Sequence, residues 1–250
     1  MRIRSLALFF CLAACLYADV MYEMTTTTTG MAGMADNEST MRIFIKKDCS
    51  RTEVTAKSEA IGTLSNTYII RLDKKVIWMF DDVNKKYTEI AIGTTADSEF
   101  SSFDSSAPKP AINVETTDER KIIMEQECKK IAVSMKLNNP GSNVNFLQEL
   151  WVVDSFPGVD EIKTFNKKLI EIGGGMMQTE EIGVDSRQLK QFVTEINNIE
   201  GFPLEIEFDV SIDVEEMKME MKTKSTVTKI SVVPISDKVF EIPEGYTLQD

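Results

Sequence analysis

The sequence predicts a mainly β fold, in which a single, mostly antiparallel sheet domain is covered by two helices. The clearest signal is residues 204–214, where apolar and polar residues alternate without a break. An alternation of period two puts every apolar side chain on one face of a strand, so this strand has one buried and one acidic, wet face. Two other stretches repeat their apolar residues at the spacing of an amphipathic helix.

The chain opens in the order of a secretory signal peptide. Arg2 and Arg4 precede a short apolar run, and small residues precede Asp19. The run is too short to span a bilayer. Cleavage after Ala18 suits ordinary signal peptidase, whereas the order Leu-Ala-Ala before Cys15 matches a bacterial lipobox, which would leave Cys15 lipidated. We therefore expect residues 1–18 to be a leader and 19–250 to be one domain, located in the periplasm, or at the outer membrane if Cys15 is lipidated.

Charge and cysteine content narrow the expected partners. Loss of the leader removes two arginines and no acidic residue, so the net charge falls from −12 to −14. That charge disfavours nucleic acid and anionic membrane surfaces as partners. Cys49 and Cys128 remain in a compartment where disulfides persist. Two alternatives stay open: a bridge, which would stabilise the fold by about 4 kcal/mol, or two buried free thiols.

Strand signals fill most of the chain, starting with a meander over residues 20–92. Residues 68–72 and 76–80 alternate on either side of a turn at 73–74, which predicts a hairpin with one apolar face. Residues 96–110 are rich in Ser, Ala, Asp and Pro, and we expect a long surface loop between two halves of the sheet. Further strands are predicted at residues 121–125, 130–137 and 146–153.

Two helices are predicted at about residues 158–172 and 186–199. The first starts after Pro157-Gly158 and stops at three glycines. In the second, Asp185 with Gln188 resembles a capping box, and Gly201 stands where a C-terminal glycine belongs. Each apolar stripe is better explained by packing on a sheet than by cofactor binding.

The last predicted hairpin turns at Glu215-Glu216. A two-residue turn there sets Met219 opposite Ile212 and Met221 opposite Val210. The methionines would then continue the apolar face of residues 204–214.

Residue types exclude many kinds of chemistry. The chain has no histidine, so histidine triads, histidine general bases and histidine metal sites are ruled out. No phosphate-binding loop or dinucleotide fingerprint occurs. Neighbouring acids such as Asp81-Asp82 fall at predicted turns, where solvation explains them. We therefore expect no enzyme, no catalytic residue, no cofactor and no resident metal.

Methionine is the unusual residue type, at 14 of 250 positions. Three explanations stay open: ordinary core filling, an adaptable apolar surface, or a Cu(I) site built from soft thioethers. The residues for a copper site would be Met31, Met34, Met217, Met219 and Met221.

Seven segments in order resemble a family of exported bacterial proteins of unknown function, whose fold is similar to that of the lipoprotein carriers LolA and LolB. They are YEMTTTTTGMAGM from Tyr22, MRIFIKKDCSRTEV from Met41, the hairpin 68–90, ECKKIAV from Glu127, LWVVDSFPGVDEIKTF from Leu150, GFPLEIEFDV from Gly201 and KVFEIPEGY from Lys238. The resemblance implies a strongly curved, incomplete antiparallel barrel with helices against its concave face. It carries over no catalytic residue.

These observations predict a non-enzymatic envelope protein that binds an apolar or amphiphilic, lipid-like ligand in a concave β surface. The candidate lining residues each lie on an alternating or helical apolar face: Ile43, Ile70, Trp78, Phe80, Phe165, Phe192, Phe208, Val210, Met219 and Met221. The rival hypotheses are a methionine-rich Cu(I)-handling envelope protein and a ligand-free module that binds other envelope proteins. No transmembrane span is expected.

Overall fold

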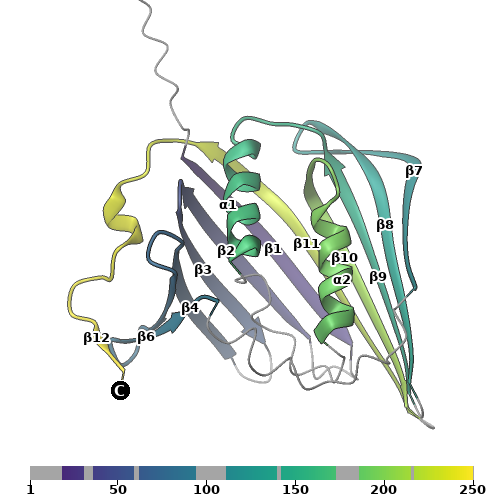
Figure 1. Ribbon diagram of the computed structural model, residues 1–250, viewed down its shortest axis with the longest axis horizontal. Coiled ribbons are helices and arrows are strands. Elements are labelled where there is room, and N and C mark those ends of the chain that lie inside the picture. Colours follow the sequence, from purple (N-terminus) through teal and green to yellow (C-terminus); the bar gives the residue numbers. More distant parts are fainter. Residues whose placement is uncertain are drawn as a thin grey trace, which may run out of the picture.

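The computed structural model describes residues 19–30, 36–58, 62–93, 111–139, 142–172, 186–214 and 217–249. Within these residues, twelve strands form one sheet that curves without closing, and two helices lie side by side against one of its faces (Figure 1). All strand pairs are antiparallel except one short pair at an edge. The predicted mainly β fold with two covering helices is confirmed.

The sheet has two halves that meet at its centre. The strands are β1 (Val20–Gly30), β2 (Asn37–Lys46), β3 (Cys49–Ser58), β4 (Gly62–Arg71), β5 (Val76–Asp81), β6 (Lys86–Ala91), β7 (Ala111–Ile123), β8 (Gln126–Asn139), β9 (Ser142–Val153), β10 (Phe202–Val214), β11 (Met217–Val232) and β12 (Thr247–Leu248). Their order across the sheet is β12-β6-β5-β4-β3-β2-β1-β11-β10-β9-β8-β7. The pairing of β1 with β11 therefore joins the first meander to the second.

Several strands are longer than predicted, most clearly β4 and β7. β4 begins at Gly62, and β7 begins at Ala111 instead of at residue 121. The added parts are mostly exposed on both faces, and β7 is the last strand of the sheet. A strand that buries neither face carries no apolar alternation, so the pattern missed it. The loop expected at 96–110 lies outside the described residues.

The helices α1 (Val159–Glu171) and α2 (Ser186–Asn197) lie where they were predicted. α1 starts directly after Gly158, whose φ is 92°, and a Cβ there would come within 2.6 Å of the Val20 side chain. The capping box expected at Asp185 lies outside the described residues. Gly201 does not cap α2. It stands at the start of β10 with φ 103°, where a Cβ would lie 2.3 Å from Val152 Cγ1, so its role is close packing of strands.

The two predicted hairpins have different outcomes. In the last one, Ile212 pairs with Met219 and Val210 with Met221, as predicted. In the earlier one, Ile70 pairs with Ile77, whereas Trp78 pairs with Ile69. The turn between Arg71 and Val76 has an even number of residues, so each even-numbered residue faces an odd-numbered one. The two alternating runs therefore point to opposite faces. The hairpin therefore has two apolar faces, and the prediction of one was wrong.

The second apolar face of this hairpin is covered by the C-terminal segment, residues 233–249. Ile235 and Phe240 are buried there against Ile69, Trp78 and Phe80. After a short 3₁₀ helix, Asp237–Phe240, the segment ends in β12, which pairs in parallel with β6. The segment thus forms an apolar core on the side of the sheet away from the helices.

Hydrogen bonds with polar side chains fasten the start and middle of this segment to the sheet. Lys46 Nζ donates to the Ile235 carbonyl at 2.6 Å, and Arg71 donates to the Phe240 carbonyl at 3.2 Å. The buried carboxylate of Asp19 accepts the Ile235 N–H at 2.7 Å. The first residue after the predicted leader is therefore part of the folded core.

Candidate ligand-binding face

The face of the sheet that carries α1 and α2, here called the inner face, has no charge over most of its extent. Strand register defines its residues, because paired residues share a face. In β1 they are Val20, Tyr22, Met24, Thr26 and Thr28, and the pairing extends this row through β2, β3 and β4 and through β11, β10 and β9. Among the described residues of these seven strands, every inner-face side chain is uncharged.

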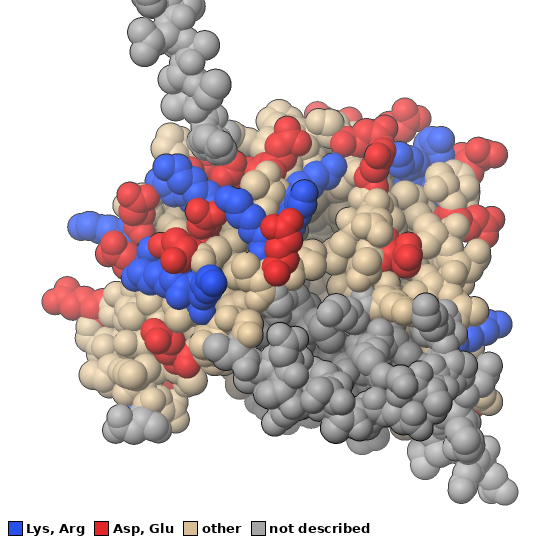
Figure 2. Space-filling model, in the orientation of Figure 1, with Lys and Arg blue, Asp and Glu red and all other residues tan. Residues whose placement is uncertain are grey.

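Charged side chains of the same strands occupy the opposite, outer face. In β10 and β11, for example, Glu207 pairs with Lys224 and Asp209 with Lys222. Helix α1 likewise carries charged side chains on its side away from the sheet (Figure 2). Acidic and basic side chains lie interspersed over α1 in the view onto the helices (Figure 2). In a chain with 27% charged residues, the inner face of these seven strands is a continuous uncharged surface.

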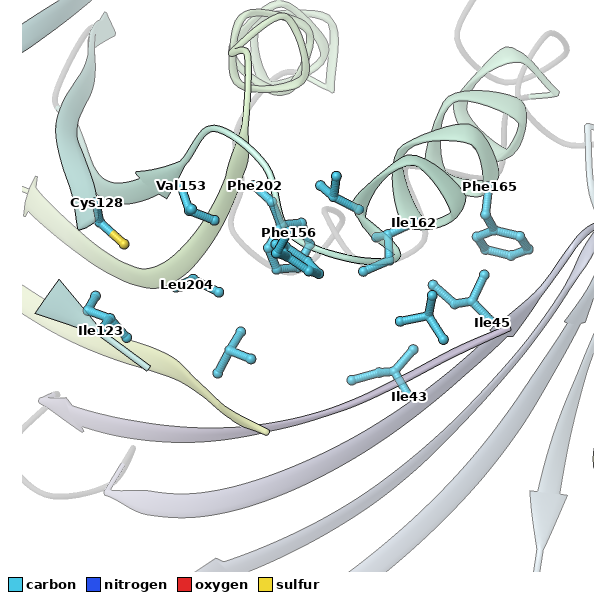
Figure 3. Close-up of a cluster of buried hydrophobic side chains, with 13 residues drawn as sticks. Ile43, Ile45, Ile123, Cys128, Val153, Phe156, Ile162, Phe165, Phe202 and Leu204 are labelled. Carbon is cyan, nitrogen blue, oxygen red and sulfur yellow. The ribbon is translucent and has the colours of Figure 1, made fainter. Parts of the chain in front are cut away.

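Beneath α1, the inner face is a packed apolar core. Ile162 and Phe165 point from the helix toward Ile43 and Ile45 on the curved sheet below (Figure 3). Tyr22 and Phe202 meet edge to face at 5.9 Å between ring centroids. This part of the face is filled by the protein itself.

A second apolar core lies beneath α2. Phe192 of the helix and Phe208 of β10 both contact Phe146, with ring centroids at 6.1 and 6.0 Å. Val210 is buried in this cluster, and Met221 packs against it. The contact between Phe192 and Phe146 therefore joins α2 to the sheet, and the contact between Phe146 and Phe208 extends the aromatic cluster within the sheet.

The two central strands carry hydroxyl groups on the inner face. Thr26 Oγ1 lies 2.8 Å from Ser225 Oγ, and Thr28 Oγ1 lies 3.3 Å from Thr223 Oγ1. Burial, with a smaller effect of the neighbouring Tyr68, raises the pKa of Tyr22 to about 12. The phenol thus stays neutral at physiological pH, and this strip of the face is polar but uncharged.

The structure brings eight of the ten predicted lining residues onto the inner face. Ile43, Ile70 and Phe165 belong to the α1 core. The α2 core contains Phe192 and Val210 and is contacted by Phe208 and Met221, while Met219 is half-buried opposite Ile212.

The other two, Trp78 and Phe80, lie on the outer face against the C-terminal segment and are not near the rest. The sequence reasoning also missed the row of hydroxyl groups formed by Thr26, Thr28, Thr223 and Ser225, here called the hydroxyl strip. The run of threonines at 25–29 predicted a strand, but only strand register shows that Thr26 and Thr28 share the inner face.

Of the two alternatives left open for the cysteines, the disulfide is absent. Cys49 and Cys128 are free, and they belong to different cores. They lie on β3 and β8, which are six strand spacings apart in the sheet, and each spacing is about 4.8 Å. A bridge needs Cα atoms within about 7 Å, so the alternative of two free thiols holds.

Only some of the residues proposed for a copper site lie in the part of the chain that the structure describes. Met31, Met34 and the side chain of Met217 lie outside the described residues, as does Cys15, while Met219 and Met221 follow one another along the inner face of β11. In the described part of the chain, no three Cys, Asp or Glu side chains are placed to hold a metal ion. No helix there is both long and apolar enough to cross a membrane.

A cleft of about 340 Å³ opens between the C-terminal end of α2 and strands β7 and β8. Its apolar lining is Val114, Ile131 and Ile199, and its polar lining is Thr116, Lys129, Glu195, Asn198 and Glu200. Ile131 belongs to the α2 core and Ile199 packs against it, so the cleft leads to the inner face. A larger groove, about 520 Å³, lies mainly over outer-face residues of β8 to β11, among them Lys136, Asp209 and Lys222.

Comparison with known proteins gives a family without an assigned activity. The model of DUF4412, a domain of unknown function, matches residues 23–246. No curated protein matches the chain. Among solved structures, a DUF1329 family protein from Desulfovibrio piger is similar at 10% identity and a TM-score of 0.32, with 90% of each chain covered.

A second solved structure, MucB in complex with MucA(peri), aligns at 5% identity and a TM-score of 0.11, covering 84% of this chain and 89% of that one. Both TM-scores are too low to establish a shared fold. The family match spans most of the chain and agrees with the expectation of a family of unknown function. The chain belongs to the DUF4412 family.

Proposed function

We propose that this protein binds an apolar or amphiphilic, lipid-like ligand on its inner face and catalyses no reaction. Its location would be the periplasm, or the outer membrane if Cys15 is lipidated. The observation that carries the proposal is the absence of charge on the inner face of the seven strands β1–β4 and β9–β11.

Core packing alone does not require this pattern. Positions such as Thr28 and Thr223 are half-exposed, and charged side chains are tolerated where water reaches them. Ligand sites instead combine apolar walls with a few uncharged polar groups that orient the ligand. The hydroxyl strip beside the two apolar cores has that composition.

The fold also offers a way to open the site. α2 rests on the sheet through Phe192, Ile196 and Ile199, and the sheet is unclosed at β7. The lipoprotein-carrier resemblance of the sequence supports the same function, since those carriers hold acyl chains between sheet and helices.

The test places a charge on one face or the other of β1. Thr28→Asp puts a carboxylate on the inner face, whereas Thr27→Asp puts it on the outer face, where Thr27 pairs with Lys224. The probe is N-phenyl-1-naphthylamine, an uncharged fluorophore that brightens in apolar surroundings. We expect Thr28→Asp to weaken its binding at least about tenfold, because an unpaired charge resists desolvation by the probe, and Thr27→Asp to leave binding unchanged.

Equal binding by both variants would contradict a site on the inner face. No binding by the unmodified protein, together with a clean mass after native mass spectrometry and lipid extraction, would contradict the function and favour the interaction module.

A further inference from the structure

We infer that the ligand is an amphiphile with a cationic head group, and that the cleft between α2 and β7–β8 holds this head while the apolar tail lies along the inner face. The inference rests on the proposed function and adds the charge and the position of the head group. The side chains that line the cleft, together with their charges, support this inference.

The cleft joins an apolar floor to a charged rim. Ile131 is almost fully buried in the α2 core, and Val114 on the edge strand is 45% exposed, so apolar surface continues from the core to solvent. The volume of about 340 Å³ is within the range of about 300–1,000 Å³ that is usual for small-molecule sites. A tail entering here would lie beside Ile199, which already contacts the α2 core.

The charge of the rim is negative. Lys129 Nζ lies 2.8 Å from Asp154 Oδ1, so its charge is compensated outside the cleft. In the described part of the chain, no salt bridge compensates Glu195 or Glu200, and both side chains are exposed at the rim. Asn198 adds an amide to the lining. Two carboxylates in the lining of a cleft that also carries three apolar side chains complement an ammonium head and repel a carboxylate or sulfate.

The whole molecule acts in the same direction, because its net charge of −12 raises the local concentration of cations. This general attraction has to be separated from recognition at the cleft. The chain offers a matched control for that purpose. Glu115 and Glu127 are exposed acids on β7 and β8 that do not line the cleft.

The test compares three ten-carbon probes by isothermal titration calorimetry, each below its critical micelle concentration: decyltrimethylammonium, decanoate and decyl maltoside. We expect the ammonium probe to bind about tenfold more tightly than decanoate, as two partly exposed ion pairs allow. The E195Q/E200Q variant should narrow that ratio to about twofold, whereas the E115Q/E127Q variant, which loses the same charge, should keep most of it.

A second pair of variants tests the position. V114W fills the cleft and should weaken decyltrimethylammonium binding at least about fivefold, while I122W, which adds the same indole at an exposed site on the same strand, should not.

Equal binding of the three probes, or equal effects of the two charge variants, would overturn the cationic head group. Unchanged binding by V114W would overturn the position. In each of these cases the naphthylamine result still decides the proposed function separately. Failure of every probe, naphthylamine included, would remove both.

Discussion

At the scale of single residues, Glu205 shows how the outer face accommodates a buried charge. The residue is 5% exposed, and its carboxylate accepts hydrogen bonds from Lys121 at 2.6 Å, Lys224 at 3.1 Å and Thr226 at 3.3 Å. Burial alone would raise the pKa of Glu205, but the two ammonium groups outweigh it, so the pKa is lowered below 4.5. The ionised form therefore stabilises the fold, and it ties β7 to β10 and β11.

The Glu205→Gln variant tests this role. We expect a loss of about 1–2 kcal/mol in unfolding free energy at pH 7, because both lysines stay solvated after the change. A lowered pKa gives stabilisation that is complete above the unfolded value of 4.5 and is lost as pH falls through the folded value. The difference from wild type should shrink at pH 3, measured by urea unfolding.

Glu207→Gln is the control, since Glu207 contacts the same Lys224 from a 38% exposed position. Its effect should stay below about 0.5 kcal/mol. An equal loss for both variants, or a difference that does not change with pH, would contradict this account of Glu205.

At the scale of elements, the C-terminal segment determines which face of the first meander is available. Phe240 is 2% exposed, and its ring belongs to the core that includes Trp78 and Phe80. Tyr246 extends this core, with its ring 5.3 Å from that of Phe80. Trp78 and Phe80 of β5, which the sequence analysis assigned to a ligand site, thus pack against the chain's own C-terminal segment.

Phe240→Ala should destabilise the protein by about 3–4 kcal/mol, as expected for removing a buried aromatic ring. Limited proteolysis should then cut within residues 233–249 more readily than in wild type. The neighbouring Val239→Ala, at a half-buried position, should cost less than about 1.5 kcal/mol. A cost for Phe240→Ala no larger than that of Val239→Ala would show that the segment does not depend on this core.

At the scale of the whole molecule, the pairing of β1 with β11 joins the two halves of the sheet, and the two cysteines belong to different halves. Burial raises the pKa of both thiols, although Arg71 partly offsets the effect at Cys49. Cys128 is fully buried and Cys49 is half-buried. Neither thiol is therefore poised to react.

Thiol titration with Ellman's reagent tests this arrangement on protein that lacks residues 1–18 and is purified without reductant. We expect both Cys49 and Cys128 to react in denaturant. In the native state, Cys49 should react slowly and Cys128 not at all on the same timescale, because only the thiolate of an accessible cysteine attacks the reagent. Mass spectrometry of the labelled protein identifies the site. No reactive thiol in denaturant would mean that a disulfide forms after all.

The sequence by itself determined the properties that follow from local periodicity. Residues 204–214 alternate at period two, and the α1 and α2 stripes repeat at helical spacing, so the strand, the helices and the register of the last hairpin could be predicted. The sequence did not show that the uncharged residues of different strands share the inner face, because that depends on strand pairing.

Only the tertiary structure decided which apolar surfaces face the helices and which the chain itself covers. Trp78 and Phe192 both lie on alternating or helical apolar faces, yet one packs under the C-terminal segment and the other under α2. The pairing of β1 with β11 and the distance between Cys49 and Cys128 likewise depend on contacts between distant segments. Periodicity shows that a face is buried, whereas its partner is set by long-range packing, which has no local signal in the sequence.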